Sequence, residues 1–312
     1  LFLYKFVRKH YSLKINIQIK ITNKVKIFFK KLLPSIFSSG VTQINILVGT
    51  IIASFQASAV SYLYYADRIY QINLAIAGIA IGTVSLPILS KAFKEKKTLK
   101  ISNIQSRSFE LSLILSLPAS LGLILASEQI VNALFGYGSF SKENINMTAS
   151  ALKYFGYGIP AFALIKILSN FFFARNDTKS PFYISSVIVL LNIFISISFF
   201  NKIGFIIIPI STSISTWVGV IIYISLLNKK NHLLLKDYLL KNILKIILNT
   251  AIMSFTLVFA LDYFADFLQY SYKFKSFYLI SIVGFVACIY LVSCYLFGLL
   301  KNKNFKVNYN EK

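Results

Sequence analysis

One acidic and one basic residue stand side by side in an otherwise apolar stretch, SYLYYADRIYQINLAIAGIAIG, over residues 61–82. Ionisable side chains are costly inside a membrane and usually mark a transport path or a paired site. A guanidinium such as that of Arg68 can bind a phosphate through two parallel hydrogen bonds. No nucleophile–base arrangement and no GxxxxGK[ST] phosphate loop accompanies it. The pair therefore favours transport of a phosphorylated substrate over hydrolysis.

Helical spacing separates the two charges. One stripe of polar and small residues contains Ser61, Tyr64 or Tyr65, Arg68, Gln71, Ala75, Gly78, Gly82 and Ser85. We interpret the half with Arg68 and Gln71 as a wall that faces water or ligand. The half with Gly78 and Gly82 has the GxxxG spacing that lets two helices approach closely, so we expect a packing seam there.

Asp67 points about 100° away from Arg68 on an ideal helix. We therefore expect Asp67 to contact a neighbouring helix; the alternative is a purely structural ion pair between helices. Lys166, in a later apolar run, either extends its ammonium toward the cytoplasm or faces a cavity. Arg107 and Glu110 are three residues apart and can pair on one helix face. Their place near the end of an apolar run favours an anchor at the membrane interface.

The composition indicates which elements position these residues. Of 312 residues, 56% are hydrophobic and 14% are charged, against roughly 25% charged in soluble domains. The mean hydropathy is +0.68. We predict an all-α, polytopic membrane protein. The net charge of +23 would suggest nucleic acid in a soluble protein, but cytoplasmic loops of membrane proteins also collect lysine and arginine. Two cysteines and two histidines show no disulfide framework and no metal-ligand spacing.

Apolar runs of membrane-spanning length predict eight transmembrane helices. They lie near residues 32–55, 60–90, 105–127, 145–172, 181–200, 204–227, 244–264 and 276–300. Loops on one side, with both ends of the chain, hold 26 of the 33 basic residues, and the opposite loops hold four. This contrast predicts that both termini of the chain are cytoplasmic.

Two basic segments interleave charged and apolar residues. Residues 1–31 are interpreted either as an interfacial helix on an anionic leaflet or as a solvated linker. Residues 232–241, HLLLKDYLLK, favour an amphipathic interfacial helix. The expected division is a basic segment 1–31, a six-helix lobe 32–227, a cytoplasmic loop 228–243, two further helices 244–300 and a tail 301–312.

Several longer stretches carry a family resemblance. QINILVGTIIASF (43–55), the run 61–91 and the run 133–182, which contains FFFARNDTKSP, resemble the MurJ (MviN) family of lipid II flippases. The resemblance implies the multidrug/oligosaccharidyl-lipid/polysaccharide exporter fold, with fourteen spans in two lobes. This chain resembles spans seven to fourteen, and because its first residue is Leu1 we expect a fragment that lacks the N-terminal lobe.

The resemblance also implies a function. The family moves the undecaprenyl-diphosphate-linked peptidoglycan precursor, lipid II, across the inner membrane by alternating access. The arginine that matches Arg68 lines a central cationic cavity in that family. The expected partners are lipid II, membrane lipids and the N-terminal lobe, with no nucleic acid. We predict substrate contacts by Arg68, Gln71, Tyr65 and Lys166, and structural or coupling roles for Asp67, Gly78, Gly82 and Asn192, with no catalytic residue, metal or cofactor.

The chain also departs from the family pattern. Many relatives carry an acid three residues after the arginine, where this chain has Gln71. Some relatives have a sodium site with an acid in the first of these spans, where this chain has Gly49. The partner pattern of the fifth span is reduced to Asn192, with Ser196 one turn on. Sodium binding is therefore not expected, although the membrane potential could drive transport.

Two alternatives remain open beside the flippase. One is a polysaccharide-lipid or small-molecule exporter of the same fold. The other is a non-transporting fragment that needs a separate partner lobe. An enzyme is not favoured, because no cluster of His, Asp or Glu lies near the end of a span.

Overall fold

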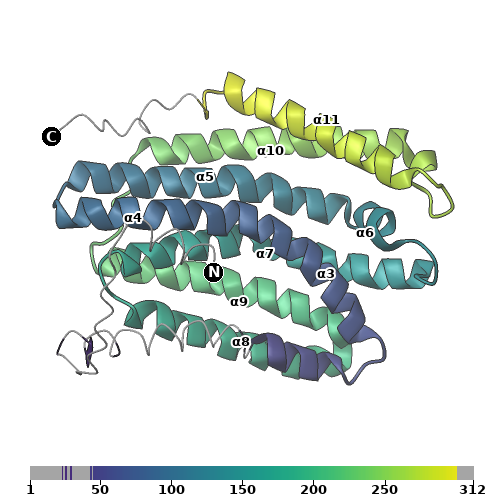
Figure 1. Cartoon of the computed structure of the whole chain (residues 1–312), viewed down its shortest axis with the longest axis horizontal. Helices are drawn as coiled ribbons and strands as arrows, with labels where there is room; N and C mark the ends of the chain where they lie inside the picture. The colour runs from purple at the N-terminus through teal and green to yellow at the C-terminus, as the bar shows by residue number, and fades with distance from the viewer. Residues whose placement is uncertain (1–22, 24, 27–28, 30–42, 44, 301–312) are drawn as a thin grey trace, which may run out of the picture.

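The computed structural model describes residues 23, 25–26, 29, 43 and 45–300. This part of the chain is helical throughout, with short connections (Figure 1). Residues 45–53 form the first described helix. The later elements are α3 (Ala59–Leu74), a π-helical turn (Ala75–Ile79), α4 (Ala80–Lys94), α5 (Thr98–Leu125), α6 (Ser127–Phe135), α7 (Lys142–Phe173), α8 (Lys179–Ile203), a 3₁₀ turn (Gly204–Ile206), α9 (Ile207–Lys229), α10 (Tyr238–Tyr263), a 3₁₀ turn (Ala265–Leu268) and α11 (Lys275–Leu296).

Six helical stretches in the described residues are long and apolar enough to cross a membrane. One of them, Lys179–Lys229, is 51 residues long and folds back on itself, so it supplies both α8 and α9. The predicted all-α architecture is confirmed, and seven of the eight predicted spans coincide with helices. Half of the first, 32–55, lies outside the described residues.

The reversal between α8 and α9 depends on Gly204. Its φ of 73° lies in the left-handed region that favours glycine. A Cβ at this position would lie 2.8 Å from Oε1 of Gln56. That same oxygen accepts a hydrogen bond from the backbone N–H of Phe205 at 2.8 Å. The turn is therefore fastened to the connection that leads into α3.

The structure corrects two expectations about local structure. Residues 232–236 form no helix, and residues 238–241 already belong to α10, so the interfacial helix over 232–241 is wrong. The backbone there is instead held by Gln105, which bonds the backbone of His232 and Leu234. The second predicted span is also not uniform, because a π-helical turn at Ala75–Ile79 interrupts it.

Helix α7 is the centre of the bundle. In the membrane-length window of α7, 78% of the residues are buried, against 22–50% in the other five stretches. It packs against α3, α4, α5 and α9, while α8 packs on α9. Helices α10 and α11 pair with each other and attach through α5 and α6, at the upper edge of Figure 1. The elements next to α7 therefore fix the site described below.

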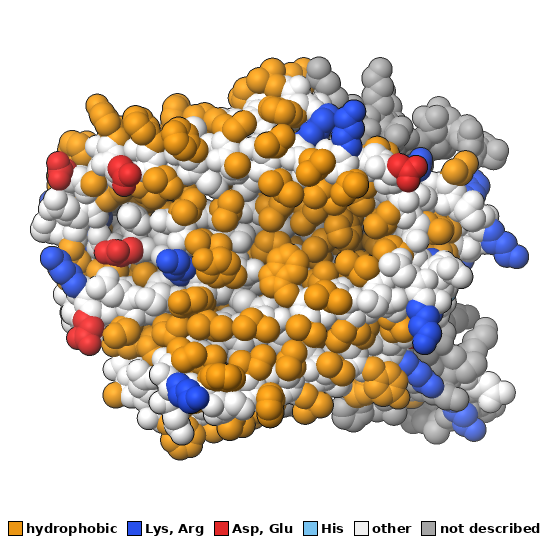
Figure 2. Space-filling model, turned by 180° about the vertical axis from the view of Figure 1, so that it is seen from behind, with side chains coloured by type: hydrophobic (Ala, Val, Ile, Leu, Met, Phe, Trp, Pro, Cys, Tyr) orange, Lys and Arg blue, Asp and Glu red, His pale blue; other side chains and the backbone are white. Residues whose placement is uncertain are grey.

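The surface has the pattern of a membrane protein. Figure 2 shows apolar side chains across the middle of one face, with most of its acidic side chains at one end and most of its basic ones at the other. Many large apolar residues are exposed along the helices, among them Ile72, Phe194 and Phe255. We call the end with the turns 95–97, 174–178 and 230–237 the basic end, at the left of Figure 1.

Candidate functional site

Arg68 lies in the half of the continuous α3–α4 helix that is distant from the basic end. Its side chain is exposed, and its guanidinium carbon lies 4.5 Å from the centre of the Tyr64 ring. Within the described residues it makes no ion pair with a carboxylate. Tyr64 is 54% exposed and stands four residues before Arg68, on the same helix face. The guanidinium is therefore held against a ring while its N–H groups are left for another partner.

Asp67 finds its partner within its own helix. The side-chain nitrogen of Gln71 donates a hydrogen bond to Oδ2 of Asp67, one helical turn away. The expected contact of Asp67 is with a neighbouring helix. The observed bond lies instead within α3, because residues four apart lie on one helix face. Gln71, expected to contact substrate, thus has at least one N–H engaged by Asp67.

Tyr65 and Tyr64 have different surroundings. The Tyr65 ring is half-buried, 4.8 Å from the Phe135 ring and 5.4 Å from the Phe140 ring. It therefore packs α3 against the α6–α7 connection. Tyr64, not Tyr65, lies beside Arg68. The stripe in the sequence did not distinguish Tyr64 from Tyr65. The spacing of four residues between Tyr64 and Arg68 is the feature that favours Tyr64.

Gly78 and Gly82 lie where the α3–α4 helix meets α7. A Cβ at Gly78 would be 3.2 Å from the Cα of Ala163. At Gly82, the backbone oxygen accepts a hydrogen bond of 2.7 Å from Nδ2 of Asn170. Lys166 lies on the same seam, its Cγ 3.5 Å from a Cβ at Gly78, and its side chain is exposed. Ten residues separate Arg68 from Gly78, roughly 15 Å along a helix, so Arg68 and Lys166 form two separate positive positions.

Asn192 is the centre of a buried polar cluster between residues 45–53, α8 and α9. Its Nδ2 donates to Oδ1 of Asn45 at 2.7 Å and to Oγ1 of Thr212 at 3.2 Å. Ser196 and Ser211 donate to its Oδ1. The cluster contains amides and hydroxyls and no charged group.

The residue of the first span that faces Asn192 is Asn45, one turn before Gly49. Gly49 lies instead against the side chain of Ile208, with 3.5 Å from a Cβ placed there. Gly49 was the residue expected at this position, and Asn45 was not expected there, although it lies four residues earlier on the same face. Among the described residues, no group of three or more His, Cys, Asp or Glu side chains could hold a metal ion.

A second polar region joins α5, α10 and the end of α11. Arg107 and Glu110 form an ion pair of 3.0 Å, as their spacing predicted. Glu110 is fully buried and accepts a further hydrogen bond from Nδ2 of Asn242, while Arg107 donates to the carbonyl of Leu299. The interpretation as an interface anchor is wrong, because the carboxylate is enclosed by protein.

The turns at the basic end form a connected network. Arg175 donates to the carbonyls of Phe171 and His232 and lies 4.0 Å from the Phe93 ring centre. Burial lowers the pKa of Arg175 to about 10. Asp177 pairs with Lys230 at 2.9 Å. Burial opposes the charge of Asp177, but hydrogen bonds from Ser180 and Lys230 outweigh it and lower its pKa.

Burial and hydrogen bonding divide the charged side chains described above into two kinds. Arg107, Arg175, Asp177 and Glu110 have protein partners, which indicates a role in holding helices together. Arg68 has an aromatic support and forms no direct ion pair with a carboxylate of the described residues. In a chain that spans a membrane, an exposed guanidinium of this kind can bind an anionic group, best one with paired oxygens such as a phosphate.

Comparison with known proteins identifies the family. Residues 1–278 match the family described as lipid II flippase MurJ. A probable lipid II flippase MurJ of Rhizobium meliloti is 37% identical over 246 residues, which cover 79% of this chain and 46% of the relative. One of Rickettsia prowazekii is 34% identical over 247 residues, 78% of this chain and 49% of the relative. The chain thus spans about half the length of the curated relatives it matches.

Solved structures show the same fold. A lipid II flippase MurJ in an inward closed conformation matches 95% of this chain and 59% of its own, with a TM-score of 0.71 and 25% identity. An outward-facing multidrug transporter of the MATE family, in the MOP superfamily, matches 84% of this chain and 61% of its own, with a TM-score of 0.57 and 16% identity. The second likeness concerns the fold alone. The chain is a multi-pass inner-membrane protein and belongs to the MurJ family of lipid II flippases.

Proposed function

We propose that the protein moves lipid II, the undecaprenyl-diphosphate-linked peptidoglycan precursor, across the inner membrane by alternating access. Membership of the MurJ family supports this transport function, and the state of Arg68 supports it at the level of a residue. The diphosphate of lipid II is the anionic group that an exposed, unpaired guanidinium suits. Transport of the intact precursor requires no covalent step.

The roles of the site residues follow from their surroundings. Arg68 binds the diphosphate, with Tyr64 holding its guanidinium flat. Gln71 contributes indirectly, because its side-chain amide donates a hydrogen bond to the Asp67 carboxylate beside Arg68. Lys166 provides a second positive position toward the basic end, while Tyr65, Gly78 and Gly82 shape the packing of α3 and α4. Asn192 joins residues 45–53 to α8 and α9.

We propose further that this chain contributes one part of the cationic cavity. The solved MurJ chain is longer than the region matched here, since the match covers 59% of it. The remaining arginines of the cavity would come from an N-terminal lobe. Residues 32–227 would form the six-helix lobe opposite it, and the pair α10–α11 would form the two additional helices, which fits their attachment through α5 and α6.

The basic end is proposed to face the cytoplasm, with both termini of the chain on that side. The support is the excess of lysine and arginine in the turns and ends on that side. Reporter fusions in the connections 95–97 and 136–141 test the orientation. A periplasmic 95–97 connection would overturn it.

We also propose that the Asn192 cluster binds no sodium ion. Its members are neutral, and their hydrogen bonds already satisfy one another, so an ion there would lack a compensating carboxylate. The membrane potential is then the expected driving force. Stabilisation of the purified protein by Na⁺ but not by K⁺ would contradict this proposal.

The decisive experiment is complementation of a strain depleted of its lipid II flippase by the full-length protein. We expect rescue by the wild type and failure of Arg68→Ala, at equal levels in the membrane. Lys202→Ala is the matched control, because Lys202 is also exposed, lies 6.0 Å from the Phe199 ring centre and makes no ion pair in the described residues. Equal rescue by Arg68→Ala and Lys202→Ala would refute the role of Arg68, and failure of the wild type would refute the lipid II assignment.

A further inference from the structure

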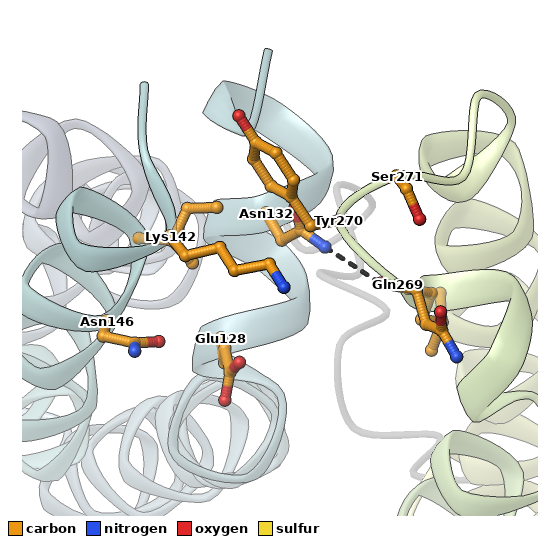
Figure 3. A pocket seen from close by; sticks show the side chains of 9 residues that line it. Glu128, Asn132, Lys142, Asn146, Gln269, Tyr270 and Ser271 are labelled. Atoms are coloured by element: carbon orange, nitrogen blue, oxygen red, sulfur yellow. Dashed lines mark hydrogen bonds between the residues drawn. The ribbon is translucent and has the colours of Figure 1, made fainter. Parts of the chain in front are cut away.

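A polar pocket of about 340 Å³ opens at the end of the bundle opposite the basic end. It lies between the first turns of α6 and α7 and the connection that precedes α11 (Figure 3). Its charged lining residues are Glu128 from α6 and Lys142 from α7, and its amides include Asn132, Asn146 and Gln269. None of these residues is among those proposed above to contact lipid II.

The back wall of the pocket is fixed by a buried lysine. Lys275 is 1% exposed, and its ammonium donates hydrogen bonds to Oδ1 of Asn132 at 3.0 Å and to the carbonyls of Gly136 and Tyr270 at 2.6 and 2.8 Å. Nδ2 of Asn132 donates to the carbonyl of Leu268 at 2.8 Å. All three ammonium protons thus have acceptors, and the wall formed by Asn132 and Tyr270 is held in place before any ligand binds.

The two charged side chains at the mouth of the pocket, unlike Lys275, are exposed. Glu128 and Lys142 are exposed, and within the described residues neither makes an ion pair. Figure 3 shows them projecting from two different helices toward the same space. Opposite charges on separate walls suit a ligand that carries both signs a few ångströms apart. A carboxylate binds a primary ammonium, and a lysine ammonium binds a phosphate as a point charge.

The surroundings indicate the depth of the pocket in the membrane. The α10–α11 connection and the helix ends beside it are rich in aromatic residues, of which Tyr263, Phe274 and Phe277 are 73%, 60% and 69% exposed. Tyr side chains concentrate at the level of the lipid headgroups. Below this level, α10 and α11 expose apolar side chains such as Phe259 and Ile280, along which acyl chains can lie.

We propose that this pocket binds the headgroup of a zwitterionic phospholipid with a primary amine, the chemistry of phosphatidylethanolamine. Glu128 takes the ammonium and Lys142 takes the phosphate. The volume lies at the lower limit of small-ligand pockets, about 300–1,000 Å³, which fits such a headgroup and not a disaccharide with its peptide. The site goes beyond the proposed transport function, since it assigns a resident lipid to the pair of helices α10–α11.

The test is a lipid series on the purified full-length protein in detergent. Binding of phosphatidylethanolamine, phosphatidylcholine and phosphatidylglycerol of equal chain length is measured by native mass spectrometry. We expect phosphatidylethanolamine to bind about fivefold more tightly than either of the others, because phosphatidylcholine has no N–H to donate and phosphatidylglycerol has no cation. Equal affinity for the three lipids would overturn the proposal, and this result is independent of any variant and of lipid II transport.

Two variants assign the charges. Glu128→Gln is expected to remove the fivefold preference for phosphatidylethanolamine, and Lys142→Gln to weaken phosphatidylethanolamine and phosphatidylglycerol alike. Glu143→Gln is the matched control, because Glu143 is also exposed in the first turn of α7 but does not line the pocket. A preference that survives Glu128→Gln, or that Glu143→Gln removes equally, would refute the assigned contacts.

Discussion

The basic end of the bundle and helix α3 use the arginine side chain in contrasting ways. At the basic end, Arg107 pairs with Glu110, and Arg175 donates to two backbone carbonyls and stacks on Phe93. On α3, Arg68 has only the Tyr64 ring. The first two guanidiniums join segments that are distant in the sequence, and the third joins nothing in the described part of the chain.

The difference separates structural from functional charge. A buried or half-buried guanidinium that is bonded to protein groups stabilises the fold, and its removal leaves those groups unsatisfied. An exposed guanidinium whose only near neighbour is a ring can be removed at little cost to the fold. The contrast predicts that stability and transport will respond to different arginines, and the following variants test it in order of decreasing effect on stability.

The largest loss of stability is expected for Glu110→Ala. This carboxylate is fully buried, and its removal leaves Arg107 and Asn242 without their shared acceptor. Breaking a buried ion pair in this way costs about 3 kcal/mol. Thermal unfolding in detergent measures the loss. Glu95→Gln is the control, because the Glu95 carboxylate also forms an ion pair, with Lys97, but is exposed. An equal loss for the two variants would show that burial is not the cause.

A smaller loss is expected for Arg175→Ala. The variant removes hydrogen bonds to the carbonyls of Phe171 and His232 and the contact with Phe93, worth about 2 kcal/mol together. The carbonyl of His232 keeps its bond from Nε2 of Gln105, which limits the damage. Arg175→Lys should recover only part of the loss, because an ammonium cannot span both carbonyls. Full recovery by lysine would refute the geometric account.

These networks show which features the sequence could predict. The spans followed from apolar runs alone, because a helix in lipid must be apolar over about 20 residues. The Arg107–Glu110 pair followed from a spacing of three. Its complete burial did not, since that depends on Asn242 and on the carbonyl of Leu299, which arrive from helices far along the chain. The helix predicted over 232–241 is wrong for the same reason, because the side chain of Gln105, which is distant in the sequence, bonds the backbone of this segment.

The candidate site was predictable to a similar degree. The position of Arg68 and the close packing at Gly78 followed from helical spacing. The partner of Asp67 did not, because an ideal helix places both Gln71 and a neighbouring helix within its reach, and only the packed structure decides between them. Asn45 was not predicted as the partner of Asn192, because the residues that face each other across two helices depend on how the helices pack and not on the sequence of either one.

A modest, pH-dependent effect is expected at His232. Burial, and the charges of Arg175 and Lys230, lower the pKa of His232 below its usual value of about 6.5. As the pH falls, the unfolded chain therefore takes up a proton before the folded protein does, and stability decreases below about pH 6.5. Melting temperatures of the wild type and His232→Gln between pH 7.5 and 5 measure this. The variant should lose part of the slope, and identical slopes would contradict the assignment.

The smallest effect on stability is expected for Arg68→Ala, although its effect on transport is proposed to be complete. The variant removes one exposed cation–π contact, worth under about 1 kcal/mol, and leaves no buried group unsatisfied. Its melting temperature should stay close to that of the wild type and well above that of Arg175→Ala. A loss as large as that of Arg175→Ala would show that Arg68 has a structural partner, and a failed complementation could then be explained by misfolding. Unchanged melting together with lost rescue would separate the two causes, because only a guanidinium that serves a ligand can be silent in the fold and essential in transport.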